Sequence, residues 1–91
     1  MTILDDAPRT GWTPRTARRH EIVTTDGMAG VLRIGDALRA AGYSVRDFAA
    51  DVRDGVPYSS VTCTVSLTSA EVEVFAERLG TLPEVVSVEP C

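Results

Sequence analysis

Apolar and polar residues alternate without a break from Ser60 to Leu67, and this alternation restricts the fold more than any other feature of the sequence. Side chains two residues apart lie on the same face of a strand, so one face of this strand is apolar and the other carries only serine and threonine. The apolar row consists of Val61, Cys63, Val65 and Leu67. We therefore predict a sheet with one packed face and one polar face, and we expect Cys63 to be a small core side chain.

Two segments show the helical spacing of apolar residues. The first follows a glycine-containing turn, is expected to begin near Ala29 and places apolar residues at steps of three and four from Val31 to Ala41, before Gly42 ends it. The second begins at the capping-box sequence that starts with Thr68 and ends at Gly80. Its charged side chains are expected on a solvated face; they are Glu71, Glu73, Glu77 and Arg78.

Three further segments have strand character: 19–25, 43–52 and 84–89. In the second of them the apolar phase changes between Val45 and Phe48, which predicts a β-bulge. The dipeptide Asp54-Gly55 then favours a hairpin into the alternating strand. The element order is β-α-β-β-α-β. We therefore predict an α+β, ferredoxin-like sandwich, with an antiparallel sheet of order 4-1-3-2 and both helices on one face.

This topology makes two further predictions. The second strand lies at an edge of the sheet, where a bare strand can pair with another chain. Cys63 and Cys91 lie on strands that are not neighbours, so we expect no disulfide between them.

The domain is predicted to span residues 19–91, preceded by a flexible arm over residues 1–18 that holds Trp12 between prolines. The arm is basic, whereas residues 20–91 have five arginines against eleven acidic residues. An acidic domain whose polar sheet face lacks aromatic residues is a poor surface for nucleic acid, so we expect no such partner. We also predict no metal site, no membrane span and, because a signal-peptide pattern is lacking, a cytoplasmic location.

Three stretches resemble the ACT domain family, whose members are small regulatory modules attached to many enzymes of amino-acid metabolism. They are DGMAGVLRIGDALRAAGYSVRDF at 26–48, YSSVTCTVSL at 58–67 and LGTLPEVVSVEP at 79–90. The resemblance implies a stand-alone homodimer that binds a small effector, such as an amino acid, at the subunit interface. It further implies a regulatory role toward a downstream protein that the sequence does not identify, without catalysis and without a cofactor.

The candidate ligand site has two parts. The first is the turn and helix start, where glycines let the backbone approach a ligand and free N–H groups favour a carboxylate; it comprises Asp26, Gly27, Met28, Ala29, Gly30, Val31 and Leu32. The resemblance implies that the partner chain contributes the second part, which comprises Tyr43, Ser44, Val45, Arg46 and Asp47. Many family members carry an acidic residue where this chain has Gly27, with Asp26 one residue farther away, so the usual acidic ligand is displaced or lost.

Other interpretations remain open at this point. The glycines of the turn can serve the turn alone, in which case the protein is a ligand-free interaction or assembly domain. An enzyme of the cofactor-free oxygenase kind would have to be built on His20, Tyr43 or Tyr58. The sole histidine, His20, is expected at the surface. An acylphosphatase is excluded because the chain contains no asparagine.

Overall fold

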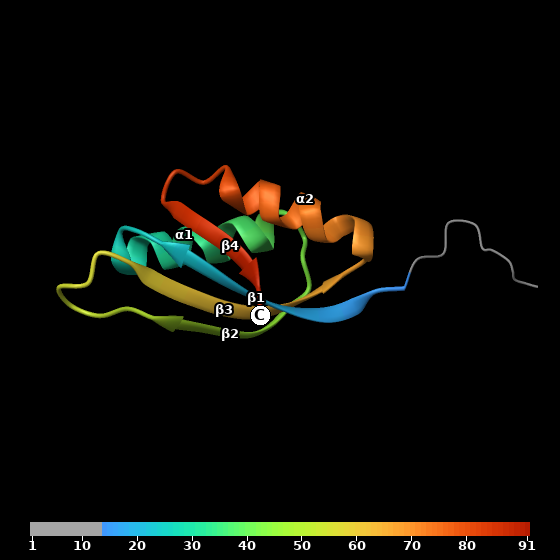
Figure 1. Ribbon diagram of the computed structural model, residues 1–91, viewed down its shortest axis with the longest axis horizontal. Helices are drawn as coiled ribbons and strands as arrows, with labels where there is room; N and C mark the ends of the chain where they lie inside the picture. Colours follow the sequence, from blue (N-terminus) through green and yellow to red (C-terminus); the bar gives the residue numbers. More distant parts are fainter. Residues whose placement is uncertain (1–13) are drawn as a thin grey trace, which may run out of the picture.

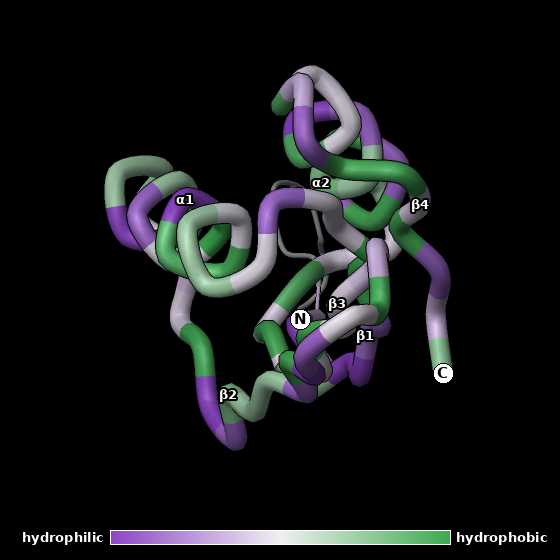
Figure 2. Tube along the Cα trace, turned by 90° about the vertical axis from the view of Figure 1, so that its left-hand side faces the viewer, coloured by the Kyte–Doolittle hydropathy of each residue, from purple (hydrophilic) through white to green (hydrophobic). Residues whose placement is uncertain are grey.

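The computed structural model describes residues 14–91, in which a four-stranded antiparallel sheet is covered on one face by two helices (Figure 1). The elements are β1 Thr16–Thr24, α1 Gly27–Ala40, β2 Val45–Asp51, β3 Ser59–Leu67, α2 Ser69–Gly80 and β4 Val85–Pro90. The strands lie in the order β2-β3-β1-β4, which confirms the ferredoxin-like topology. Figure 2 shows both helices above the strands, with β2 and β4 at the two sides of the sheet.

Strand β1 begins at Thr16, three residues before the predicted strand, because the long strand β3 offers a pairing partner as far as Leu67. Thr16 and Leu67 are the last pair of this ladder. Residues 1–13 of the predicted arm, and Trp12 with them, lie outside the described residues. No helix within residues 14–91 has the length and apolar character needed to cross a membrane.

The core lies between the helices and the inward rows of β1 and β3. Every second residue of β3 from Ser59 to Leu67 is buried, as the alternation predicts. The buried apolar residues are Ile22, Val31, Ile34, Leu38, Val61, Cys63, Val65, Leu67, Phe75 and Leu79. Cys63 is fully buried, Cys91 is exposed, and neither forms a disulfide, so the expectations for both cysteines are confirmed.

The predicted start of α2 and the predicted end of α1 are confirmed by their hydrogen bonds. At the start of α2 the Thr68 hydroxyl accepts from the Glu71 N–H, while the Glu71 carboxylate accepts from the Thr68 N–H, which is a complete capping box. At the end of α1, Gly42 has a positive φ of 80° and its N–H donates to the Arg39 carbonyl. The Tyr43 N–H donates to the Leu38 carbonyl, which completes a Schellman motif.

Strand β2 contains the predicted bulge. Its register on β3 shifts between Arg46 and Ala49, and Asp47 within the shift has a φ of 53°. Helix α1 packs mainly on β1 and β3, and it approaches β2 at Phe48, whose Cζ would lie 3.9 Å from a Cβ at Gly35. Six of the seven β2 residues are therefore exposed, and the strand is an open edge.

The prediction that His20 lies at the surface is wrong: its side chain is 2% exposed. His20 alternates with Ile22 and Thr24 on the inward row of β1, so the phase of the strand places the imidazole in the core. Its ring lies 4.8 Å from the Phe75 ring, and its Nδ1 has no hydrogen-bond partner among the described residues. The core thus contains an ionisable group that folding separates from water.

Because His20 is buried, we expect the free energy of unfolding to depend on pH. Desolvation lowers the pKa of His20 below 6.5; the Arg18 backbone opposes this in part, and the charge of Arg18 adds a smaller lowering. The unfolded chain therefore binds the proton more strongly. The contribution of the neutral His20 ring to the free energy of unfolding is fully present above the pKa that His20 has in the unfolded chain. This contribution is lost as the pH falls below that pKa. We expect urea denaturation to show a falling free energy of unfolding from about pH 7 to about pH 5.

The variant His20→Met is the control, because it keeps an uncharged side chain in the core and cannot titrate. The chain has one histidine, so the slope in this pH range is expected to flatten in the variant. An unchanged slope would show that the pH dependence arises elsewhere.

Candidate functional site

Helix α1 begins at Gly27, two residues before the predicted start near Ala29, so Gly30 is not the first residue of the helix. Asp26 precedes it in the left-handed conformation, with a φ of 72°, and its side chain makes no capping hydrogen bond. The first intrahelical bond runs from the Gly30 N–H to the Asp26 carbonyl at 3.4 Å. Among residues 14–91, no side chain caps the N–H groups of Gly27, Met28 and Ala29.

Gly30 has a steric role in this turn. A Cβ at this position would lie 2.2 Å from the Thr25 carbonyl oxygen and 2.6 Å from the Thr24 hydroxyl. The end of β1 is itself fixed, because the Thr25 N–H donates to the Glu84 carbonyl at 2.9 Å. Only glycine permits α1 to pack this closely on β1.

The side chains of the predicted turn differ in their access to a ligand. Val31 is 4% exposed and belongs to the core, and Gly30 is buried. Met28 and Leu32 are 56% and 62% exposed. Contact with a ligand at this turn therefore depends on the first-turn N–H groups, the Asp26 carboxylate and the exposed pair Met28 and Leu32.

The second part of the predicted site lies at the other end of α1 in the same chain. A helix of 14 residues is about 21 Å long, so residues 43–47 are remote from Gly27 within one protomer. Tyr43 and Ser44 connect α1 to β2, Val45 and Arg46 begin β2, and Asp47 forms the bulge. One chain therefore does not bring the two parts together.

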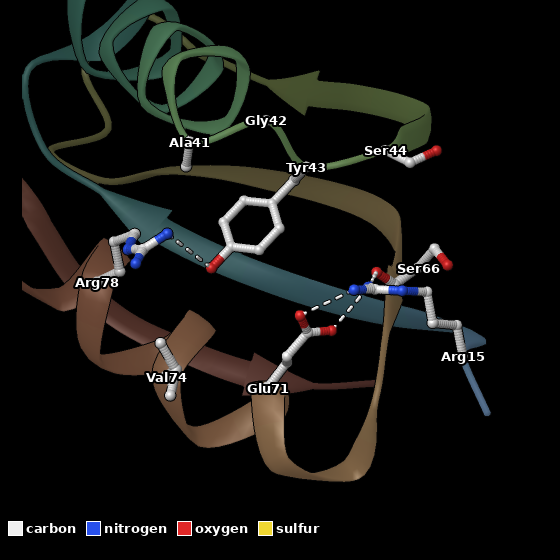
Figure 3. Close-up of a pocket in the computed structure, with 9 residues that line it drawn as sticks. All are labelled: Arg15, Ala41, Gly42, Tyr43, Ser44, Ser66, Glu71, Val74 and Arg78. Carbon is white, nitrogen blue, oxygen red and sulfur yellow. Dashed lines mark hydrogen bonds and ion pairs between the residues drawn. The ribbon is translucent and has the colours of Figure 1, made fainter. Parts of the chain in front are cut away.

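A cavity of about 420 Å³, which the sequence analysis did not anticipate, opens beside Tyr43 (Figure 3). It lies between the α1–β2 connection, the start of β1 and one face of α2. The lining residues are Arg15, Ala41, Gly42, Tyr43, Ser44, Ser66, Glu71, Val74 and Arg78. Positions 71, 74 and 78 share one face of a helix, which is the only local signal of this cavity in the sequence.

An ion pair closes one end of the cavity. The Arg15 guanidinium donates to both carboxylate oxygens of Glu71, at 2.7 and 3.0 Å, and also to the Ser66 carbonyl oxygen at 3.3 Å. The hydrogen bond from the Thr68 backbone, followed by the one from Arg15, lowers the pKa of Glu71. The Glu71 side chain is 36% exposed, so it lies on the predicted solvated face, and it forms an ion pair there that was not predicted.

The opposite end of the cavity carries Arg78. Its Nη1 donates to the Tyr43 hydroxyl at 3.4 Å, and its guanidinium carbon lies 5.8 Å from the centre of the Tyr43 ring. The Tyr43 ring packs edge-on against Phe75 at 5.2 Å, which fixes the ring that Arg78 contacts.

The three residues considered for catalysis do not converge. His20 is in the core on one side of Phe75, and Tyr43 contacts another side of the same ring. Tyr58 lies apart, in a hollow with Val23 and Asp51. Within residues 14–91, no group of three histidine, cysteine, aspartate or glutamate side chains is placed to hold a metal ion.

The packing at Gly30 predicts a large effect of a single methyl group. In Gly30→Ala the new Cβ overlaps backbone and side-chain oxygens that cannot move freely. We expect the free energy of unfolding in urea to fall by about 1–3 kcal/mol. The matched control is Gly80→Ala, where a Cβ meets no atom within 4 Å and stability should change by less than about 1 kcal/mol. Equal losses in the two variants would contradict the steric role of Gly30.

No protein-family profile matches the sequence, and no curated protein matches it. Among solved structures, the chain is similar to the ACT domain from GTP pyrophosphokinase of Chlorobium tepidum, which was determined by solution NMR. The superposition has a TM-score of 0.73 and covers 85% of this chain and 86% of the other, at 13% sequence identity. Likeness at this identity concerns the fold, and it confirms the predicted one: the chain has the ACT-like fold.

Proposed function

We propose that this protein is a regulatory module that binds a small molecule, such as an amino acid, as a homodimer with the ligand at the subunit boundary. Ligand binding would then be transmitted to a further protein. The observation that carries the proposal is the position of the uncapped first turn of α1 beside the end of the open edge strand β2. The free thiols of Cys63 and Cys91 are compatible with a reducing cytoplasm.

Pairing of β2 with a second copy would bring the two parts of the site together. A Cβ at Gly27 would lie 4.0 Å from Cγ1 of Val52, so the first turn of α1 adjoins the end of β2. In an antiparallel pair centred on Phe48, the partner's Val45 would stand opposite Asp51. The partner's residues 43–47 would then approach the first turn of α1.

Apolar side chains along this boundary also favour a partner. We call Met28, Leu32, Phe48 and Val52 the α1–β2 border. Met28 and Leu32 are one helical turn apart on α1, and Phe48 and Val52 lie on and just after β2. Their exposed fractions are 56, 62, 42 and 39%. A second copy seated on β2 would remove these side chains from water.

The first turn of α1 offers groups that suit a zwitterion. Its uncapped N–H groups and the positive end of the helix dipole favour a carboxylate. The Asp26 carboxylate is not used as a cap and is available to an ammonium group. From the second subunit, the partner's Arg46 and the partner's Asp47 would add one charge of each sign. The positive φ of Gly27, 55°, leaves the backbone open to close approach.

A ligand-free assembly domain is the second candidate. The observation in its favour is that steric packing alone accounts for Gly30, without a ligand. Both candidates use the same dimer and differ only in ligand binding, so they call for separate experiments on assembly and on binding.

For assembly, we expect Leu32→Arg to convert the dimer to a monomer, because dimerisation would bury the introduced charge. Leu32 is exposed in the single chain, so the fold should tolerate the change. Sedimentation equilibrium gives the mass. The control is Val86→Arg on β4, where a side chain of similar exposure, 56%, is replaced at the other edge of the sheet. Dissociation by Val86→Arg alone, or a monomeric wild-type protein, would contradict the proposed boundary.

For ligand binding, each common L-amino acid is tested singly for stabilisation against urea. A bound amino acid at a hundred times its Kd is expected to raise the free energy of unfolding by about 2.7 kcal/mol. Ala29→Asp should abolish this gain, since its carboxylate competes for the first-turn N–H groups, while the free protein gains about 0.3–1 kcal/mol from the helix dipole.

Ala29→Asn is the matched control, because it adds an isosteric side chain without charge and should retain most of the binding. If no amino acid stabilises the wild-type protein, the ligand-free assembly domain is the better description.

A further inference from the structure

We propose that the cavity beside Tyr43 is a second binding site, complete within one chain, for a small monocarboxylate with a short apolar tail. Every lining residue comes from a single protomer, so this site is complete without the dimer, although Tyr43 and Ser44 also belong to the second part of the proposed amino-acid site. Its volume, about 420 Å³, lies within the range of about 300–1,000 Å³ found for small-molecule sites.

Arg78 supplies the group that would recognise the ligand. Among the described residues it contacts the Tyr43 hydroxyl and ring, and it forms no ion pair with a carboxylate. A guanidinium has five N–H donors in a planar fork, and one of the donors is used for Tyr43. The others can donate to both oxygens of a carboxylate, which is the geometry that arginine recognises best.

The charges of the other lining residues favour a ligand that carries a single negative charge. Arg15 and Glu71 neutralise each other through two short hydrogen bonds, so among the described lining residues Arg78 is left as the one charge without an opposite partner. The lowered pKa of Glu71 keeps its carboxylate ionised at neutral pH. A second negative charge on the ligand would face Glu71 without a second free cation, which disfavours a phosphate dianion.

The rest of the lining suits a short apolar tail. The Val74 side chain is 46% exposed, and it shares this cavity with the methyl group of Ala41 and with the Tyr43 ring. In Figure 3, Val74 and Arg78 both extend from α2, and Tyr43 and Ala41 lie across from them, so a ligand between these elements can contact Arg78 and apolar side chains together. A carboxylate on Arg78 with a branched aliphatic tail against Val74 satisfies both features.

Binding here would connect two elements that otherwise meet through Tyr43. Arg78 belongs to α2, whereas Tyr43 and Ser44 belong to the connection between α1 and the edge strand β2. The Ser44 carbonyl already accepts the Ser66 N–H at 3.2 Å, so the connection is anchored to β3 on its other side. A bound carboxylate would add a contact from α2 to this connection.

The experiment titrates ¹⁵N-labelled protein with isovalerate and follows the backbone amide signals. We expect saturable shifts at Ser44, Val74 and Arg78, and small ones at Ala29. The neutral amide isovaleramide, identical in shape, should bind at least about tenfold more weakly, because it lacks the charge that pairs with Arg78. Inorganic phosphate should also bind more weakly than isovalerate. Equal binding of the amide, or tighter binding of phosphate, would overturn the assignment.

Variants provide an independent comparison. Arg78→Gln should weaken isovalerate binding by at least about tenfold. Arg39→Gln removes the same charge from an exposed arginine outside the cavity and should leave binding unchanged. Ala29→Asp, which blocks the proposed amino-acid site, should also leave isovalerate binding unchanged. The two proposed sites can therefore be refuted independently of each other. If isovalerate produces no saturable shifts in the wild-type protein, or binds Arg78→Gln equally well, the cavity is not a carboxylate site.

Discussion

The contact between Gly30 of α1 and the end of β1 determines how the rest of this molecule is arranged. Thr25 is held to the Glu84 carbonyl, and Arg33 of α1 pairs with the Glu84 carboxylate at 3.0 Å, so helix and strand end are fixed to the same corner. With its start fixed there, α1 extends over β1 and β3 and leaves β2 as an open edge. The uncapped first turn and the exposed α1–β2 border both result from this placement.

Features encoded by adjacent residues could be predicted from the sequence. The alternation along β3, the capping box at Thr68 and the phase change that marks the bulge at Asp47 each involve neighbours in the chain. Short-range backbone hydrogen bonding and side-chain periodicity determine such features almost alone. Together with the right-handed crossover rule they were sufficient for the strand order, and hence for the ACT-like fold.

Features that depend on long-range packing could not be predicted in the same way. His20 was judged by residue type, whereas its position two residues before the buried Ile22 is what decides its burial. The cavity beside Tyr43 is lined by Arg15 before β1, by the α1–β2 connection, by the end of β3 and by α2. These segments are far apart in the sequence, so no local pattern reveals the cavity. The start of α1 was predicted to within two residues. The steric role of Gly30 could not be predicted, because it depends on how close Thr24 of β1 lies to the helix.

The two edges of the sheet are chemically unequal. Strand β4 ends in Pro90, which has no amide proton to offer, and its register on β1 is interrupted next to Val23. Strand β2 has no proline, and its bulge at Asp47 bends it locally. Pro90 therefore disfavours strand addition at the end of β4, which opposes growth of the sheet by repeated head-to-tail addition into a filament.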